Sequence, residues 1–493
     1  MQATSSYPSP DLIDYLRRDP LGHVIDGITE RGDQAGTHPV LDPSSGRTIA
    51  TIGLGTARDV DRAVASARTA FPEWRARTPA QRATALFALA DLIQQNAELL
   101  AQLESMNVGK PLATSRDEIP GVVDTFRLMA GAARTGTTPG ADEYAEGHLS
   151  FIRRQPLGVV AAITPWNYPL LTAAWKVAPA LAAGNTVVVK PSELTPLTTV
   201  LFAELAAKVL PAGAVNVVLG DGDGVGRPLA EHPEIDMISL TGSVDSGVAV
   251  AASAAATLKR VHLELGGKAP VIVFGDADLT GVAQSLRTAA YWNAGQECGA
   301  ATRVLCEASV AKQLTDELKA TVATLRSGGP GDGEEIELGP LVSEQHLARV
   351  DALVQDAIER GATAVLGGGR DISRPGFFFQ PTILTDIPAG SAIATAEIFG
   401  PVVTIETFEG EAEAIDKAND SRYGLSASVW TENGRRGLRV VEELDYGTVW
   451  LNSHLVLANE MPWGGFGASG NGREQSAYAI EEFSRTKHVM LAK

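Results

Sequence analysis

The chain has 493 residues, of which 44% are apolar and 20% charged, and its formal net charge is −18 at pH 7. This length exceeds the size at which one hydrophobic core keeps growing, so two or three domains are expected. The acidic charge argues against nucleic-acid or anionic-membrane partners, and no apolar run reaches the ~18 residues of a spanning helix.

Two cysteines, eight residues apart, exclude a disulfide framework and indicate a reducing compartment. The first residues lack a basic region followed by an apolar run, so no signal peptide is expected. The predicted location is therefore cytoplasmic. No metal site is predicted.

The first 20 residues are expected to form an arm rather than part of the core, and helices are expected to follow. Residues 1–20 are polar and contain Pro8 and Pro10. Thr56-Ala-Arg-Asp59 offers an N-cap and an acidic third position, and Thr78-Pro-Ala-Gln81 forms a capping-box arrangement with a first-turn proline. Around 151–156 the pattern changes to the alternation of a strand.

From residue 157 onwards, short β-rich runs alternate with helical stretches. The first set of strands is predicted at 159–163, 186–190, 215–219 and 235–240, with helices near 170–183, 196–210 and 224–231. The second set is predicted at 269–274, 302–306, 364–366 and 402–405, with helices near 278–293, 309–325 and 343–360. This rhythm predicts two α/β domains with parallel sheets, joined near residue 265.

Two segments suggest covalent chemistry. Cys298 lies in Asn293-Ala-Gly-Gln-Glu-Cys-Gly-Ala300, where small residues leave the backbone free to approach the sulfur. Glu264-Leu-Gly-Gly-Lys268, 34 residues upstream, offers a carboxylate before a diglycine turn. A thiol nucleophile needs a base, because only a few per cent of a free thiol is ionised at neutral pH. The alternative is a buried structural thiol, which is the expected role of Cys306.

Both segments resemble signatures of the aldehyde dehydrogenase superfamily, and the resemblance extends from about residue 40 to the C-terminus. It implies NAD-dependent oxidation of an aldehyde to the acid. Cys298 would form a thiohemiacetal and then a thioester, and Glu264 would activate the hydrolytic water. Asn167 matches the asparagine that binds the developing oxyanion. Lys176 is similar to a lysine that the family places near the site. A non-catalytic structural relative is the alternative from another class, and Glu264 argues against a CoA-acylating relative.

The resemblance also implies an NAD site. Gly242 and Ser243 follow a predicted strand and open a helix, where free N–H groups favour a pyrophosphate; a simple helix cap is the alternative. Lys190, Ser192 and Glu193 resemble the adenine-ribose segment. A carboxylate at Glu193 repels a 2′-phosphate, so NAD is preferred over NADP, although Lys190 and Glu193 also fit a solvated surface pair. Further implied cofactor contacts are Ile163, Thr164, Pro165, Trp166, Leu265, Glu397 and Phe399.

Within the superfamily, Asp117-Glu-Ile-Pro120 and Glu460-Met-Pro-Trp-Gly-Gly465 resemble the aminoaldehyde and betaine aldehyde enzymes. Four aromatics match the substrate funnel of such enzymes, which would attract an ammonium group through cation–π interactions: Tyr168, Trp175, Trp292 and Trp463. Core packing is the alternative for each of them. Glu118 is expected to draw in the amine, or else to lie on a solvated helix surface.

The predicted substrate is 4-aminobutyraldehyde or another ω-aminoaldehyde, with betaine aldehyde or another small aldehyde as the alternative. A semialdehyde enzyme should show basic residues aimed at a carboxylate, and none stands out. Two departures leave the aldehyde open. Trp463 stands where many 4-aminobutyraldehyde enzymes carry His, and Gly299 where relatives often carry Thr or Ser.

The implied fold class is α/β, with a Rossmann-like NAD-binding domain, an α/β catalytic domain and a small β oligomerisation element. The NAD-binding domain is predicted at 1–137 and 159–265, and the catalytic domain at 266–466. The oligomerisation element and the C-terminal tail are predicted at 138–158 and 467–493. Exposed strand edges are seldom left unpaired, so a homodimer or homotetramer is expected.

Overall fold

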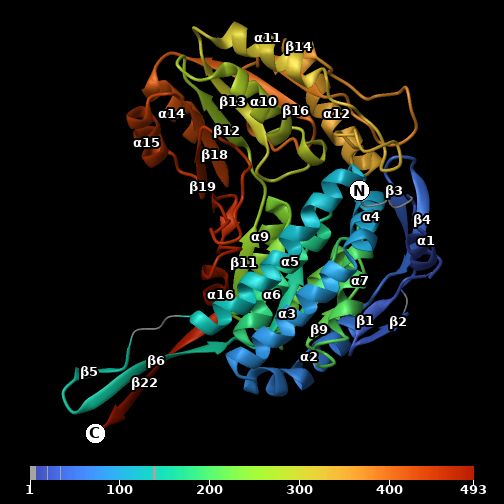
Figure 1. Ribbon diagram of the computed structural model, residues 1–493, viewed down its shortest axis with the longest axis vertical. Coiled ribbons are helices and arrows are strands. Elements are labelled where there is room, and N and C mark those ends of the chain that lie inside the picture. Colours follow the sequence, from blue (N-terminus) through green and yellow to red (C-terminus); the bar gives the residue numbers. More distant parts are fainter. Residues whose placement is uncertain (1–6, 19, 34, 137–139) are drawn as a thin grey trace.

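The computed structural model describes the chain except for residues 1–6, 19, 34 and 137–139. The domain boundary predicted between 137 and 138 lies outside the described residues. Two sheets covered by helices form the body of the molecule, and a narrow three-stranded sheet projects from it (Figure 1). The predicted α/β fold class is confirmed. The described residues include no helix long and apolar enough to cross a membrane.

The first sheet has the order β2-β1-β9-β8-β7-β10-β11-β21, and its five central strands are parallel. The bounds of its strands are β1 (His23–Ile25), β2 (Ile28–Glu30), β7 (Val159–Ile163), β8 (Thr186–Lys190), β9 (Val215–Val217), β10 (Met237–Thr241), β11 (Arg260–Glu264) and β21 (Gly470–Asn471). The predicted strands at 159–163 and 186–190 are confirmed to the residue.

Helices cover both faces of this sheet, which explains why its strands are almost continuously apolar. Val160 and Ala162 of β7 pack in the cluster that contains α3 to α7, whereas Val159 and Ala161 pack with α2, α8 and α9. The bounds of the helices are α2 (Ala57–Ala76), α3 (Pro79–Gln95), α4 (Ala97–Val108), α5 (Leu112–Thr135), α6 (Pro169–Ala183), α7 (Leu197–Ala206), α8 (Arg227–Glu231) and α9 (Val244–Ala255).

The two predicted helix starts are confirmed. Thr78 caps α3, because its hydroxyl accepts a hydrogen bond from Gln81 N–H, and the Gln81 side chain accepts one from Thr78 N–H at 2.9 Å. At the start of α2, Asp59 has the role that Gln81 has in α3: its side chain accepts a hydrogen bond from Thr56 N–H at 2.8 Å.

The second sheet has the order β14-β15-β16-β13-β12-β18-β19. Its strands are β12 (Ala269–Val273), β13 (Ala301–Glu307), β14 (Thr363–Leu366), β15 (Thr382–Thr385), β16 (Val402–Phe408), β18 (Ser426–Trp430) and β19 (Thr448–Leu451). One face carries α10 (Leu279–Ala289), α11 (Ala311–Val322) and α12 (Glu344–Glu359), and the other carries α14 (Glu411–Asn419) and α15 (Gly434–Glu443) (Figure 1). Cys306 is fully buried in β13, which confirms its structural role.

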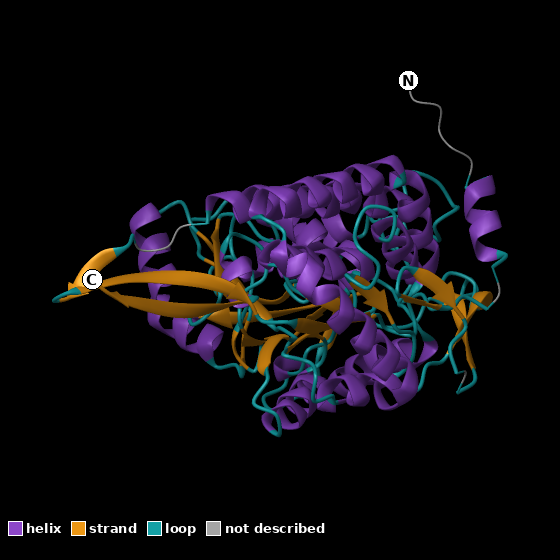
Figure 2. Cartoon of the chain, turned by 90° about the horizontal axis from the view of Figure 1, so that it is seen from below, coloured by secondary structure: helices purple, strands orange, loops and turns teal. Residues whose placement is uncertain are grey.

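The projecting sheet has the order β22-β6-β5, with β5 (Asp142–Ala145), β6 (His148–Pro156) and β22 (Ser484–Ala492) (Figure 2). β6 and β22 pair along their whole length, from Ser484 opposite Pro156 to Ala492 opposite His148. The remaining short elements are β3 (Thr37–Asp42), β4 (Arg47–Gly53), β17 (Tyr423–Gly424), β20 (Phe466–Gly467), α13 (Ala392–Thr395), α16 (Tyr478–Glu482), η1 (Gly222–Gly226) and η2 (Trp292–Gly295).

The prediction that residues 1–20 form an arm outside the core is wrong for the part that is described. Pro10–Leu16 forms α1, which Ser9 caps and whose Leu12 and Tyr15 are buried against the core of the first sheet. The two prolines misled the prediction, because Pro10 occupies the first helical turn, where its missing N–H costs nothing.

Replacing Leu12 by alanine should lower the midpoint temperature of unfolding by several degrees, because a fully buried leucine truncated to alanine costs about 2–5 kcal/mol. Ile13, the exposed neighbour on the same helix, is the matched control, and Ile13→Ala should leave the midpoint almost unchanged. Thermal unfolding followed by circular dichroism measures both. Equal midpoints for the two variants would contradict the packing of α1.

Candidate active site

A cavity of about 1400 Å³ lies at the carboxyl edge of the first sheet. The last residues of β7, β8, β10 and β11 all line it: Ile163, Lys190, Thr241 and Glu264. Ligands of open parallel sheets bind at this edge. The opposite wall includes Cys298 and other residues that belong to the second sheet and its loops.

The two sheets meet at the diglycine turn that follows Glu264. A Cβ atom on Gly267 would lie 2.4 Å from the Cys298 carbonyl oxygen, and one on Gly266 would lie 2.2 Å from a Glu397 carboxylate oxygen. A side chain at Gly267 would collide with backbone, whereas one at Gly266 would have to displace the side chain of Glu397. The diglycine therefore brings the loop of Cys298 and the end of β11 to the same cavity.

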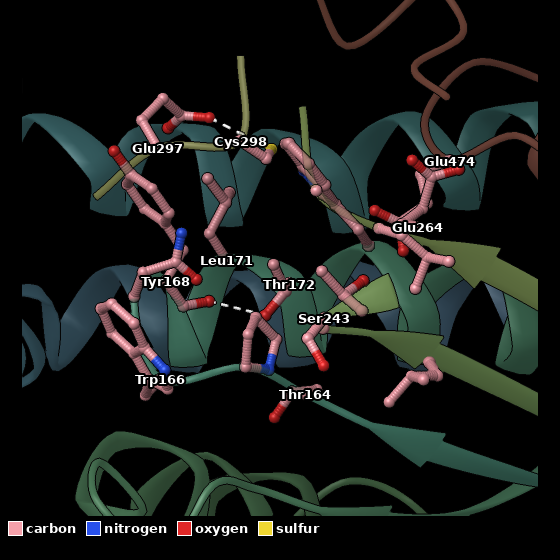
Figure 3. Close-up of a pocket in the computed structure, with 18 of the residues that line it drawn as sticks. Thr164, Trp166, Tyr168, Leu171, Thr172, Ser243, Glu264, Glu297, Cys298 and Glu474 are labelled. Carbon is pink, nitrogen blue, oxygen red and sulfur yellow. Dashed lines mark hydrogen bonds between the residues drawn. The ribbon is translucent and has the colours of Figure 1, made fainter. Parts of the chain in front are cut away.

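The sulfur of Cys298 lies beside a carboxylate (Figure 3). Its Sγ donates to Glu297 Oε1 at 3.3 Å, and Gly299 N–H donates to the same oxygen at 3.1 Å. Burial, and then the charge of Glu297, raises the pKa of Cys298 well above its usual range. Asn167 braces this loop, because its side-chain amide donates to the Gln296 carbonyl at 2.9 Å. The amide group has a second hydrogen, which a substrate oxygen can accept.

Glu264 ends β11 and is almost fully buried. Neither carboxylate oxygen has a hydrogen-bond partner among the described residues. Burial, and then the nearby carboxylate of Glu474, raises its pKa well above the usual range. A carboxylate whose pKa is raised is a stronger base once it is ionised, which suits a general base.

Lys176 does not line the cavity. It is fully buried, and its ammonium donates to Glu474 at 2.6 Å and to the hydroxyl of Ser239 at 3.0 Å. The charge of Lys176 lowers the pKa of Glu264. Its predicted electrostatic role in the reaction stays a prediction.

All the residues predicted to bind the cofactor line the cavity: Ile163, Thr164, Pro165, Trp166, Lys190, Ser192, Glu193, Gly242, Ser243, Leu265, Glu397 and Phe399. Ser243 also caps α9 by accepting from Ser246 N–H at 3.1 Å, so the helix-cap alternative is confirmed, while the cofactor contact stays a prediction. Lys190 and Glu193 do form a pair, with 3.6 Å between ammonium and carboxylate, but Lys190 is buried, so the expectation that the pair is solvated is wrong for the lysine.

All four predicted aromatics line the cavity, and so does Glu118. Trp175 and Trp463 pack with Leu425 and Trp450 in an apolar cluster against which Cys298 lies. The two departures noted in the sequence are linked, because a Cβ atom on Gly299 would lie 2.9 Å from the Trp463 ring. A larger residue at 299 therefore conflicts with the position of this indole.

The environments of Tyr168 and Glu118 differ from the predicted ones. The ammonium of Lys110 lies 4.0 Å from the centre of the Tyr168 ring, so one face of that ring is already occupied by a cation. Glu118 accepts from the same ammonium at 2.6 Å, and burial raises its pKa to about 8. The solvated-surface alternative for Glu118 is therefore wrong.

Sequence reasoning missed Glu297, Lys110 and Glu474. Glu297 could have been found, because it directly precedes Cys298 and a neighbouring carboxylate disfavours the thiolate. The other two could not, because Lys110 lies far in sequence from Tyr168, and Glu474 lies far from Lys176.

The sequence profile of the aldehyde dehydrogenase family matches residues 30–489. A betaine aldehyde dehydrogenase of Bacillus subtilis is 40% identical over 471 residues, which cover 94% of this chain and 96% of that protein. The chloroplastic betaine aldehyde dehydrogenase of Beta vulgaris is 38% identical over 475 residues, 94% of this chain and 95% of that protein.

Solved structures give the same result. The betaine aldehyde dehydrogenase of Staphylococcus aureus, in complex with NAD+, has a TM-score of 0.95 at 37% identity and covers 98% of this chain and 97% of its own. An NAD-dependent aldehyde dehydrogenase of Sinorhizobium meliloti has a TM-score of 0.94 at 38% identity, over 97% and 96% of the two chains. The chain belongs to the aldehyde dehydrogenase family, and the predicted enzyme class is confirmed.

Replacing Glu297 by glutamine should lower the pKa of Cys298, because a nearby carboxylate disfavours the thiolate. The variant should therefore be alkylated faster by iodoacetamide near neutral pH, and its rate should reach half-maximum at a lower pH than in the wild type. Labelling is followed by mass spectrometry of peptides. Cys306, fully buried, serves as an internal control that stays unlabelled. An unchanged pH profile would show that Glu297 does not act on the sulfur.

Proposed function

We propose that the protein oxidises an ω-aminoaldehyde, with 4-aminobutyraldehyde as the first candidate, to the carboxylic acid. The observation that carries this proposal is that Cys298 lies against an apolar cluster containing Trp175 and Trp463 in a cavity also lined by carboxylates. The enzyme is an NAD-dependent aldehyde dehydrogenase, so the open question is the aldehyde.

NAD is the cofactor, and the residues at the carboxyl edge of the first sheet fit it. The cavity exceeds the ~300–1,000 Å³ of ordinary small-ligand sites. The N-terminus of α9 can receive a pyrophosphate at Ser243. Glu193 and Glu397 offer carboxylates to ribose hydroxyls, and Glu193 would repel a 2′-phosphate. When bound, NAD accepts the hydride of the aldehyde.

In the proposed reaction, Cys298 attacks the aldehyde carbon, and Asn167 donates to the developing oxyanion. Loss of hydride converts the thiohemiacetal to a thioester, and Glu264 takes a proton from the water that hydrolyses it. Since burial raises the pKa of Glu264, this last step should accelerate as pH rises through that pKa, because only the ionised carboxylate is a base.

The pocket supports a cationic tail on the substrate. Tryptophan faces attract ammonium groups by up to ~2 kcal/mol when both are desolvated. Asp117, Asp124 and Glu297 also line the cavity and add negative charge. Betaine aldehyde is the second candidate, because its trimethylammonium group suits the same aromatic cluster and relatives such as that of Bacillus subtilis are betaine aldehyde dehydrogenases.

Two further features belong to this proposal. β5, β6 and β22 form a thin projecting sheet with exposed apolar residues, including Tyr144 and Leu491, which supports assembly into a homodimer or homotetramer.

Both cysteines are free thiols, and a reactive thiol at Cys298 fits a cytoplasmic location. The domain bounds expected from the sequence remain part of the same proposal.

Replacing Trp463 by alanine should raise KM for 4-aminobutyraldehyde about 30-fold more than for neutral butanal, since ~2 kcal/mol of cation–π attraction is lost only for the cation. Trp463→Phe, which keeps an aromatic face, should recover part of this difference. The measurement is steady-state NADH formation with 4-aminobutyraldehyde, betaine aldehyde, succinic semialdehyde and butanal. The same data rank 4-aminobutyraldehyde against betaine aldehyde as the substrate. If KM rose equally for charged and neutral aldehydes, Trp463 would contribute only apolar contact, and the aminoaldehyde assignment would lose its support.

A further inference from the structure

A buried histidine stands two residues before Glu264 on the same strand. Side chains at positions i and i+2 of a strand share a face, so His262 and Glu264 both point away from the cluster that contains Val261 and Leu263. His262 Nε2 lies 3.9 Å from Glu264 Oε1. Both atoms are buried without a hydrogen-bond partner among the described residues.

The other ring nitrogen of His262 is held by a chain of hydrogen bonds. Ser239 lies opposite His262 in the pairing of β10 with β11, and its hydroxyl lies 2.7 Å from His262 Nδ1. The ammonium of Lys176 donates to that hydroxyl at 3.0 Å, and Glu474 holds the ammonium at 2.6 Å. All four side chains are almost fully buried.

This chain fixes the tautomer of the imidazole. A lysine ammonium is only a donor, so the Ser239 oxygen accepts from it and the hydroxyl hydrogen is left to donate. His262 Nδ1 is the acceptor within reach of that hydrogen. Burial, and then the charges of Lys176 and Arg473, lowers the pKa of His262 well below its usual range, so the ring is neutral. The single ring proton is therefore on Nε2, which faces Glu264.

We propose that His262 is a positioning residue for Glu264: its Nε2–H donates to the ionised carboxylate and holds it in place for hydrolysis of the thioester. The two atoms are 3.9 Å apart, so the proposal requires the Glu264 carboxylate to approach the ring to hydrogen-bond length. The donor stabilises the charged form of Glu264, which the buried site otherwise disfavours. This inference rests on the proposed role of Glu264 as the hydrolytic base.

Other groups around Glu264 define the background for this effect. Lys176 and Arg473 favour the ionised carboxylate, whereas Glu474 and Glu482 disfavour it. A purely structural role for the ring also has support, because the ring packs 6.0 Å from that of Phe483 and a Cβ atom on Gly472 would lie 2.0 Å from it. The test must therefore separate hydrogen bonding from packing.

The test is rapid mixing of the enzyme with NAD and aldehyde, in which the initial burst of NADH reports thioester formation and the following steady rate reports hydrolysis. His262→Leu keeps the apolar volume and removes the donor. Its burst rate should stay within about twofold of the wild type, while hydrolysis at pH 7 should be roughly tenfold slower, with its half-rise about one pH unit higher. His262→Gln, which regains an N–H donor, should recover most of the loss.

Two controls make the result decisive. Glu264→Gln should itself slow hydrolysis, and His262→Leu should add nothing to it, because the histidine acts through the carboxylate. Ser239→Ala keeps the imidazole ring but removes the hydroxyl that fixes its tautomer. The pH at which hydrolysis reaches half its maximum rate should therefore rise by less than in His262→Leu. This variant replaces His262→Leu in the test if the latter does not fold.

The proposal would be overturned if His262→Leu hydrolysed the thioester at the wild-type rate and with the wild-type pH profile. It would also be overturned if His262→Leu and His262→Gln were equally defective. Wild-type hydrolysis in Glu264→Gln would instead overturn the proposed function of Glu264 itself. The two failures are therefore distinguishable.

Discussion

The close contact between Gly267 and the Cys298 carbonyl is the constraint on which the site depends. The strand that carries Glu264 and the loop that carries Cys298 belong to different sheets, and no other residue type lets their backbones pass so closely. Gly266 makes equal room for the carboxylate of Glu397. One dipeptide thus brings Cys298, Glu264 and Glu397 to the same cavity.

Burial at this junction is costly for stability and useful for chemistry. Two carboxylate oxygens of Glu264 remain without partners among the described residues, which proteins normally avoid. The same burial raises the pKa of Glu264 and of Cys298, so the site disfavours the charged form of both groups. Substrate, oxyanion donor and neighbouring dipoles can compensate for the charge that develops during the reaction. The Lys176–Glu474 pair and the neutral His262 supply a fixed polar background behind the base.

The sequence predicted the parts of this molecule that depend on local patterns. Apolar β-branched runs predicted β7 and β8 to the residue, and the capping box at Thr78 predicted the start of α3. The sequence could not predict contacts between residues that lie far apart along the chain. The cation of Lys110 over the Tyr168 ring, and the link from Glu474 through Lys176 to Ser239, exist only because tertiary packing brings these groups together.

The most direct test of this account is the mass of the Glu264→Gln enzyme after it is mixed with NAD and 4-aminobutyraldehyde and quenched in acid. A near-stoichiometric acyl adduct is expected on the peptide containing Cys298, with one NADH formed per adduct, because the thioester forms but hydrolyses slowly. The matched Cys298→Ala variant should carry no adduct. An adduct that is absent from Cys298, or one that forms without NADH, would contradict the central claim that a thioester at this sulfur precedes hydrolysis through Glu264.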